Sequence, residues 1–123
     1  MRVLWKLEAI TGEKITLLRA PSGDYTDQSL EVAKSLEMQT IQWNVDSLDY
    51  TGLSVDEIVQ RVVSRIENGS IILFHNGVEN TAEALDVALT RLSKQGYTFV
   101  SVDDLIYMDD YYLDHTGKQH KNI

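Results

Sequence analysis

Residues 55–74 read VDEIVQRVVSRIENGSIILF and combine one helix and one strand in a short stretch. Apolar residues at helical spacing predict an amphipathic helix from Val55 to Glu67, and its apolar stripe consists of Val55, Ile58, Val59, Val62, Val63 and Ile66. Ser54 and Glu57 form a capping-box pattern at the start of this helix, and Asn68-Gly69 marks its end. The continuous apolar run Ile71–Phe74 then predicts a strand buried on both faces, which is typical of a parallel sheet.

The alternation of strand and helix extends in both directions from this stretch. We predict further strands over residues 13–19, 38–45 and 97–100, and further helices over residues 1–9, 27–37, 80–96 and 101–106. Asn80 with Glu83 is a second capping-box pattern. Regular alternation favours right-handed crossovers, so the predicted fold class is α/β with a mostly parallel sheet of about four strands. These strands form either a small open sheet or part of a barrel.

Composition and charge restrict the possible partners. The chain has 123 residues, no cysteine and a formal net charge of −8. A negative surface repels phosphate backbones, so we expect no nucleic-acid partner. No apolar run approaches the ~20 residues of a membrane-spanning helix, so we expect no membrane segment, and residues 1–10 lack the apolar block of a signal peptide. We divide the chain into a domain of residues 1–107 and an acidic, polar tail of residues 108–123 that frays beyond Tyr112.

Polar side chains follow three of the predicted strands. Ligands of α/β folds bind at the carboxyl ends of strands, where this sequence places Arg19, Asp46, Asp49 and His75. Histidine titrates near neutral pH, and a neighbouring carboxylate orients its ring and favours its protonated form. Either Asp46 or Asp49 is a suitable partner for His75. The same residues are also compatible with an isolated histidine and a structural Arg–Asp pair.

Four segments occur in an order that carries a family resemblance. They are RAPSGDY at residues 19–25, WNVDSLDY at 43–50, IILFHNG at 71–77 and GYTFVSV at 96–102. Together they closely resemble the second half of the polysaccharide deacetylases of carbohydrate esterase family 4, which share the NodB homology domain, and above all the sporulation and peptidoglycan-acting members. The resemblance covers about residues 12–106. It implies the second half of a distorted (β/α) barrel and metal-dependent hydrolysis of N-acetyl groups on peptidoglycan or a chitin-like glycan.

The resemblance also implies three catalytic roles. His75 matches the general acid that protonates the leaving amine, and Asp49 matches the aspartate that tunes this histidine. Arg19 matches the arginine that orients the catalytic-base aspartate. Asn76 stands where the family often has Asp, which is a departure from the pattern.

Three further positions match substrate-binding residues of the family. Ser22 stands where many members have Tyr, and its backbone N–H would contribute to the oxyanion hole. Tyr50 replaces the usual Trp of the substrate groove, and Leu73 matches the residue that receives the acetate methyl group. Leu73 is also compatible with a place in the core, and Tyr50 with the edge of a sheet.

The family motifs that hold a divalent, zinc-like metal precede these segments in the family and have no match here. There is no Asp-Asp pair before Arg19, so we expect no metal site in this chain and no activity from it alone. Asp114, His115 and His120 suit a solvated tail better than a metal site, because a five-residue spacing of the histidines does not match one helix face.

Half a barrel exposes sheet edges and an apolar face, so we expect a homodimer or a complementing N-terminal half as partner, besides the polysaccharide. The resemblance implies an extracytoplasmic or cell-envelope location. The alternative function is a non-catalytic glycan-binding or assembly module. A receiver-type α/β domain fits less well, because Arg19–Ser22 occupies the place of its acidic residues.

Overall fold

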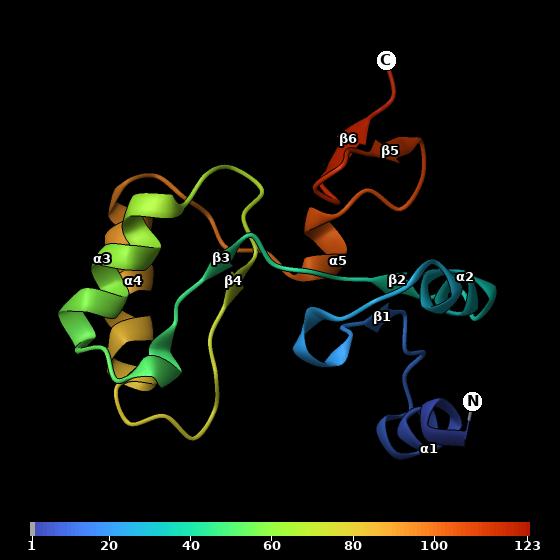
Figure 1. The fold of residues 1–123 in the computed structure, drawn as a ribbon, viewed down its shortest axis with the longest axis horizontal. Coiled ribbons are helices and arrows are strands. Elements are labelled where there is room, and N and C mark those ends of the chain that lie inside the picture. The colour runs from blue at the N-terminus through green and yellow to red at the C-terminus, as the bar shows by residue number, and fades with distance from the viewer. Residues whose placement is uncertain (1) are drawn as a thin grey trace. The chain divides into compact units, whose positions relative to one another are not determined.

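We describe residues 2–123 in a computed structural model, in which the chain divides into two compact units, Met1–Gln42 and Trp43–Ile123. The elements are labelled in Figure 1. None of the helices within residues 2–123 combines the length and the apolar character needed to cross a bilayer.

The first unit pairs two short parallel strands beside two helices. Its elements are α1 (Arg2–Thr11), β1 (Leu17–Leu18), the 3₁₀ turn η1 (Pro21–Gly23), α2 (Asp27–Ser35) and β2 (Gln39–Thr40). Strands β1 and β2 are parallel, with Leu17 opposite Gln39 and Leu18 opposite Thr40. Thr26 and Ser29 form a capping box that begins α2.

The second unit contains the predicted helix-and-strand stretch. Its elements are β3 (Val45–Asp46), η2 (Asp49–Thr51), α3 (Val55–Arg65), β4 (Ile72–Leu73), α4 (Thr81–Lys94), α5 (Val102–Leu105), β5 (Tyr111–Leu113) and β6 (Gln119–Lys121). Helices α3 and α4 lie side by side (Figure 1), and strands β3 and β4 are parallel. The buried core of this unit consists of Val45, Ile58, Val59, Val62, Ala84, Ala88 and Leu92.

The predicted helices and the parallel pairing are confirmed, but the strands are shorter and more finely divided than predicted, and the one predicted over residues 13–19 is only Leu17–Leu18. The strand predicted over residues 38–45 is two strands, because β2 pairs with β1 whereas β3 pairs with β4. Residues 97–100 form no strand, because no described strand lies in register beside them and the Tyr97 N–H donates to the Leu92 carbonyl instead. The sheet of about four strands is thus two parallel pairs, one in each unit.

The expected fraying beyond Tyr112 is wrong. Strands β5 and β6 form an antiparallel hairpin with Tyr112 opposite His120. The Asp114 carboxylate accepts the backbone N–H groups of Thr116 and Lys118, at 2.8 and 3.2 Å, and Gly117 supplies the positive φ of the turn. Local turn chemistry therefore orders residues that composition alone marks as a solvated tail, and the division at residue 107 remains a prediction.

Candidate functional site

Asp49 and His75 meet at the carboxyl ends of β3 and β4. The parallel register places Asp46 opposite Leu73, so both strands end at the same edge and the loops after them are neighbours. The His75 Nδ1 atom lies 2.7 Å from Asp49 Oδ1, and the His75 backbone N–H donates to Asp49 Oδ2 at 2.8 Å. Of the two aspartates that the sequence left open for His75, Asp49 makes the contact.

Asp46 is the last residue of β3, and its side chain contacts the turn that follows the strand. Its Oδ1 atom accepts the Leu48 N–H at 3.0 Å, and Leu48 adopts a left-handed conformation with φ 52°. Gly52, with φ 84°, then ends η2 before α3 begins. Asp46 therefore shapes the turn that carries Asp49 toward His75.

Asp49 is a buried carboxylate whose oxygens are both occupied by donors. It is only 1% exposed, and the Thr81 hydroxyl donates to its Oδ2 atom at 2.6 Å. Burial alone would raise the pKa of Asp49, but the hydrogen bonds from Thr81 and from the His75 backbone and ring outweigh burial and lower this pKa below its ordinary value. Asp49 is thus ionised at neutral pH and able to stabilise a protonated His75.

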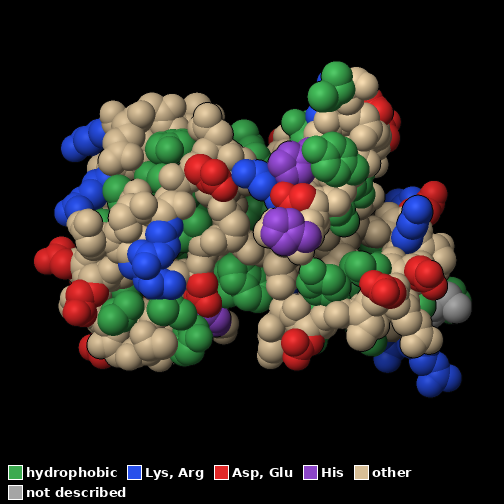
Figure 2. Space-filling view, turned by 45° about the horizontal axis from the view of Figure 1, so that its top comes forward, with side chains coloured by type: hydrophobic (Ala, Val, Ile, Leu, Met, Phe, Trp, Pro, Cys, Tyr) green, Lys and Arg blue, Asp and Glu red, His purple; other side chains and the backbone are tan. Residues whose placement is uncertain are grey.

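The imidazole of His75 is held at one nitrogen and open at the other. Because ionised Asp49 can only accept, Nδ1 carries the proton of the shared hydrogen bond. Nε2 has no hydrogen-bond partner within residues 2–123, and 37% of the His75 side chain is exposed. Histidine side chains reach the surface in Figure 2. This arrangement suits a proton donor or acceptor facing a bound molecule.

Tyr50 lies against the same imidazole. The two ring centroids are 4.7 Å apart with an interplanar angle of 71°, an edge-to-face contact that limits rotation of the His75 ring. Tyr50 itself is 57% exposed, so its ring forms part of the surface beside His75. Leu73 is 7% exposed and precedes this loop at the end of β4.

Arg19 and Ser22 belong to the first unit, and the other four predicted site residues belong to the second. Arg19 follows β1 and its side chain is exposed. Ser22 lies in η1 with a positive φ of 56°, an uncommon conformation for a residue other than glycine. The roles of both residues remain predictions.

Thr81 is the site residue that sequence reasoning missed. We predicted a capping box at Asn80 and Glu83, and that prediction is wrong: Asn80 makes no side-chain cap and its Nδ2 donates to the Leu53 carbonyl at 3.0 Å. The sequence could have indicated Thr81, because a helix that follows a strand in a parallel α/β unit begins at the carboxyl edge of the sheet. A hydroxyl on its first residue therefore faces the same edge as Asp49 and His75.

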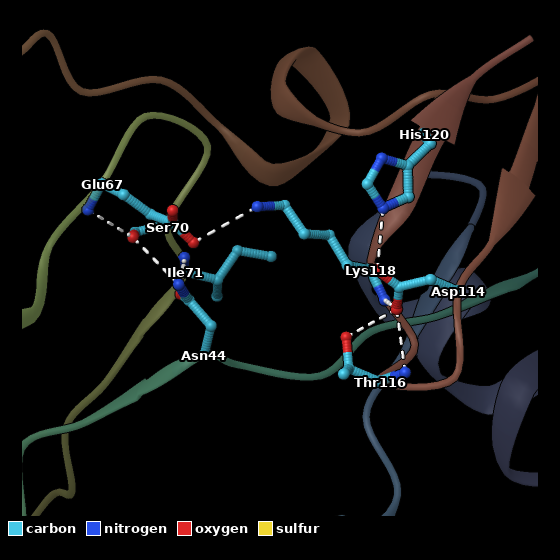
Figure 3. Close-up of polar contacts among 8 residues, drawn as sticks. All are labelled: Asn44, Glu67, Ser70, Ile71, Asp114, Thr116, Lys118 and His120. Atoms are coloured by element: carbon cyan, nitrogen blue, oxygen red, sulfur yellow. Dashed lines mark hydrogen bonds and ion pairs between the residues drawn. The ribbon is translucent and has the colours of Figure 1, made fainter.

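A second Asp–His pair lies in the hairpin, as Figure 3 shows. His120 Nε2 is 2.8 Å from Asp114 Oδ2, and the Thr116 hydroxyl donates to Asp114 Oδ1 at 2.6 Å. The Tyr112 ring stacks on His120, with centroids 5.1 Å apart. Lys118 reaches from the hairpin to Glu67, at 3.3 Å between Nζ and Oε1. These contacts explain why the turn is ordered.

Comparison with known proteins finds one matching family and several relatives among peptidoglycan deacetylases. The family described as Polysaccharide deacetylase matches residues 2–41. The peptidoglycan-N-acetylmuramic acid deacetylase PdaA of Bacillus subtilis is 37% identical over 102 residues, which cover 80% of this chain and 39% of PdaA. The peptidoglycan-N-acetylglucosamine deacetylase PgdA of Listeria monocytogenes is 36% identical over 95 residues, which cover 77% of this chain and 20% of PgdA.

Solved structures share the fold. A carbohydrate esterase family 4 pseudoenzyme from Bacillus anthracis matches with a TM-score of 0.79 and 34% sequence identity, covering 88% of this chain and 37% of that protein. A mutant of the same pseudoenzyme, described as having restored enzymatic activity, matches with a TM-score of 0.80. The chain therefore spans less than half the length of each of these relatives.

Proposed function

Because this chain carries part of a polysaccharide deacetylase domain of carbohydrate esterase family 4, with the α/β fold of a partial barrel, we propose that it supplies the general-acid side of an N-deacetylase site. The observation that supports this proposal is the Asp49–His75 pair, with its buried carboxylate and its open Nε2. The substrate is an N-acetylated polysaccharide.

His75 acts at the step in which the amide C–N bond breaks. The protonated imidazole donates its Nε2 proton to the amide nitrogen as the tetrahedral intermediate collapses, which releases acetate and a free amine. The imidazole becomes neutral in the same step. Asp49 remains ionised throughout, holds the ring through Nδ1 and stabilises the imidazolium before transfer.

The proposal gives roles to four further residues. Tyr50 forms a wall of the sugar groove beside His75, and Leu73 receives the acetate methyl group. The Ser22 N–H stabilises the oxyanion, and Arg19 orients the base. Exposure of Tyr50 and its contact with His75 support the first of these roles, and the other three rest on the motifs that the residues match.

Polysaccharide deacetylases of this family depend on a metal, and the described residues of this chain do not fit one. No group of three or more His, Cys, Asp or Glu side chains within residues 2–123 is arranged to hold a metal ion. We therefore assign no step to a metal here. The zinc-like ion and the catalytic base belong, in this proposal, to a complementing N-terminal half, and the chain alone does not hydrolyse its substrate.

The substrate class and location follow from the relatives by analogy. PdaA and PgdA are named as peptidoglycan deacetylases. We assign this chain to the same class of glycan, and to an extracytoplasmic place at the cell envelope where such a glycan is found.

Acetate release tests the proposal. The chain alone, and the chain mixed or fused with a family N-terminal half that carries the metal motifs, are each incubated with N-acetylated peptidoglycan fragments. We expect acetate only in the second case, with a loss of at least about 100-fold in His75→Ala. Undiminished release by that variant would contradict a general-acid role.

A non-catalytic glycan-binding or assembly module is the second candidate, favoured by the similarity to a pseudoenzyme. In that case the complemented protein releases no acetate, and the chain still binds the peptidoglycan fragments or the other half. Binding that is lost in Tyr50→Ala but kept in His75→Ala would indicate this function.

A further inference from the structure

We propose that Thr81 is a positioning residue that orients Asp49 and thereby fixes the direction in which His75 presents Nε2. This inference rests on the proposed function for its catalytic meaning and on the described contacts for its geometry. It adds a residue from α4 to a site whose other described residues come from η2, β4 and the loop after β4.

The Thr81 hydroxyl has one available role at Asp49. A carboxylate only accepts hydrogen bonds, so the 2.6 Å contact commits the Thr81 proton to Oδ2. The His75 N–H donates to the same oxygen at 2.8 Å. Oδ2 is thus held by two donors, which leaves Oδ1 directed at the His75 ring nitrogen at 2.7 Å.

Thr81 lies on a helix that is anchored in the core. Thr81 is the first residue of α4, and the helix is anchored in the core by Ala84, Ala88 and Leu92, each at most 1% exposed. Asp49 and His75 lie in short segments after strands of two residues each. A hydroxyl on the anchored helix therefore sets the carboxylate plane more firmly than either loop does.

The neighbouring polar and charged groups do not donate to Asp49 in place of Thr81. Tyr50 contacts the His75 ring by its edge, and the Asp46 carboxylate is used by the Leu48 N–H. From α3, the Arg61 Nε donates to the Asp46 backbone carbonyl at 2.8 Å. Within residues 2–123, the donors to Asp49 Oδ2 are the Thr81 hydroxyl and the His75 backbone N–H.

Two isosteric changes test the inference by nuclear magnetic resonance. Thr81→Val keeps the shape and removes the donor, whereas Thr81→Ser keeps the donor. The His75 amide proton reports on Asp49, because it is bonded to Oδ2. We expect the pKa of Asp49 to rise in Thr81→Val, because the carboxylate loses a donor, and to stay near the wild-type value in Thr81→Ser.

The ring itself gives the second readout. The nitrogen-15 shifts of His75 show which ring nitrogen carries the proton, and we expect the neutral form to lose its preference for Nδ1–H in Thr81→Val. The matched control is Thr116→Val, which removes an equivalent 2.6 Å hydroxyl bond from Asp114 and should leave Asp49 and His75 unchanged. An unchanged Asp49 titration in a folded Thr81→Val protein would overturn the inference.

A measurement on the unmodified chain covers the case in which Thr81→Val does not fold. The Thr81 hydroxyl proton should exchange slowly with water and show a cross-peak to the His75 amide proton; a rapidly exchanging hydroxyl contradicts the inference. Failure of the proposed function is a separate result, because acetate release that survives His75→Ala leaves both resonance readouts intact.

Discussion

Asp49 and His75 meet across 26 residues of sequence, whereas Asp114 and His120 meet across six. Both aspartates also accept a threonine hydroxyl at 2.6 Å, from Thr81 and Thr116 respectively. The Asp49 side chain is fully buried, but the Asp114 side chain is 28% exposed. The same three residue types therefore form one pair that depends on the packing of a whole unit and another that depends on a single turn.

The two pairs also use opposite ring nitrogens. Asp49 holds Nδ1 of His75 and leaves Nε2 open, whereas Asp114 holds Nε2 of His120. Nε2 is the nitrogen farther from the backbone, so a ring held at Nδ1 extends its free nitrogen toward a bound molecule. The comparison shows that an Asp–His contact alone does not identify a proton-transfer site; the free nitrogen and the burial of the carboxylate distinguish the two.

The largest expected effect comes from the core of the unit that carries the first pair. Leu92→Ala should lower the free energy of unfolding by about 3 kcal/mol, because it leaves a cavity beneath α4. We expect the Asp49–His75 contact to loosen and the hairpin pair to keep its resonances. Urea unfolding followed by Trp43 fluorescence, in a Trp5→Phe background, measures the change. If the resonances of His75 and His120 changed equally, the two pairs would not differ in their dependence on the core.

Removal of the buried carboxylate should have the next largest effect. Asp49→Ala leaves the Thr81 hydroxyl and the His75 N–H without their acceptor, and we expect a loss of about 2 kcal/mol in the free energy of unfolding. The same urea titration measures it. The matched variant is Asp114→Ala, for which we expect loss of hairpin resonances and an unchanged unfolding midpoint of the Trp43 signal.

Acid should weaken the first pair over a defined range. The pKa of Asp49 is lower in the folded protein than its ordinary value of 3.8, so the unfolded chain takes up this proton first as the pH falls. The stabilisation from Asp49 is therefore complete above about pH 5 and is lost as the pH falls below 3.8 toward the folded-state pKa. Urea midpoints between pH 6 and pH 2 test this, and Asp49→Asn should flatten the decline.

The smallest expected effect concerns the link between the hairpin and the rest of its unit. Lys118 and Glu67 are more than half exposed, so Lys118→Ala should change the free energy of unfolding by less than about 0.5 kcal/mol. Hydrogen exchange of the hairpin amides, compared at low and high salt, detects any local loosening. A large change in the exchange of β4 amides would show that the hairpin stabilises the strand before His75.

Helices were more predictable than strands and contacts. The apolar stripe of α3 and the cap at Ser54 follow from local spacing, so the prediction over residues 55–67 came within two residues of the observed end at Arg65. The break between β2 and β3 depends on which distant strand each one pairs with, and periodicity carries no such information. The hairpin was missed because we judged residues 108–123 by their charge and did not consider the turn that Asp114 and Gly117 form.

The functional site was also predictable only in part. His75 and Asp49 were accessible from the motifs and from the rule that strand ends carry ligands. Strand position alone left Asp46 and Asp49 open, the family motifs favoured Asp49, and the structure gives the contact to Asp49 after a left-handed turn at Leu48. Thr81 was hidden by an apparent cap at Asn80, whose side chain instead bonds to the Leu53 carbonyl. Long-range hydrogen bonds decide these points, and they exist only after the unit has folded.

Asp49, His75 and Thr81 all lie within one uninterrupted stretch of sequence, residues 49–81, that runs from η2 through α3 and β4 to the start of α4. Genetic recombination with breakpoints outside this stretch would transfer the acid, its carboxylate and its threonine support together. A breakpoint inside it would separate groups that are useful only in combination. The Asp49–His75–Thr81 group is therefore inherited as one segment, whereas Arg19 and Ser22 lie outside it.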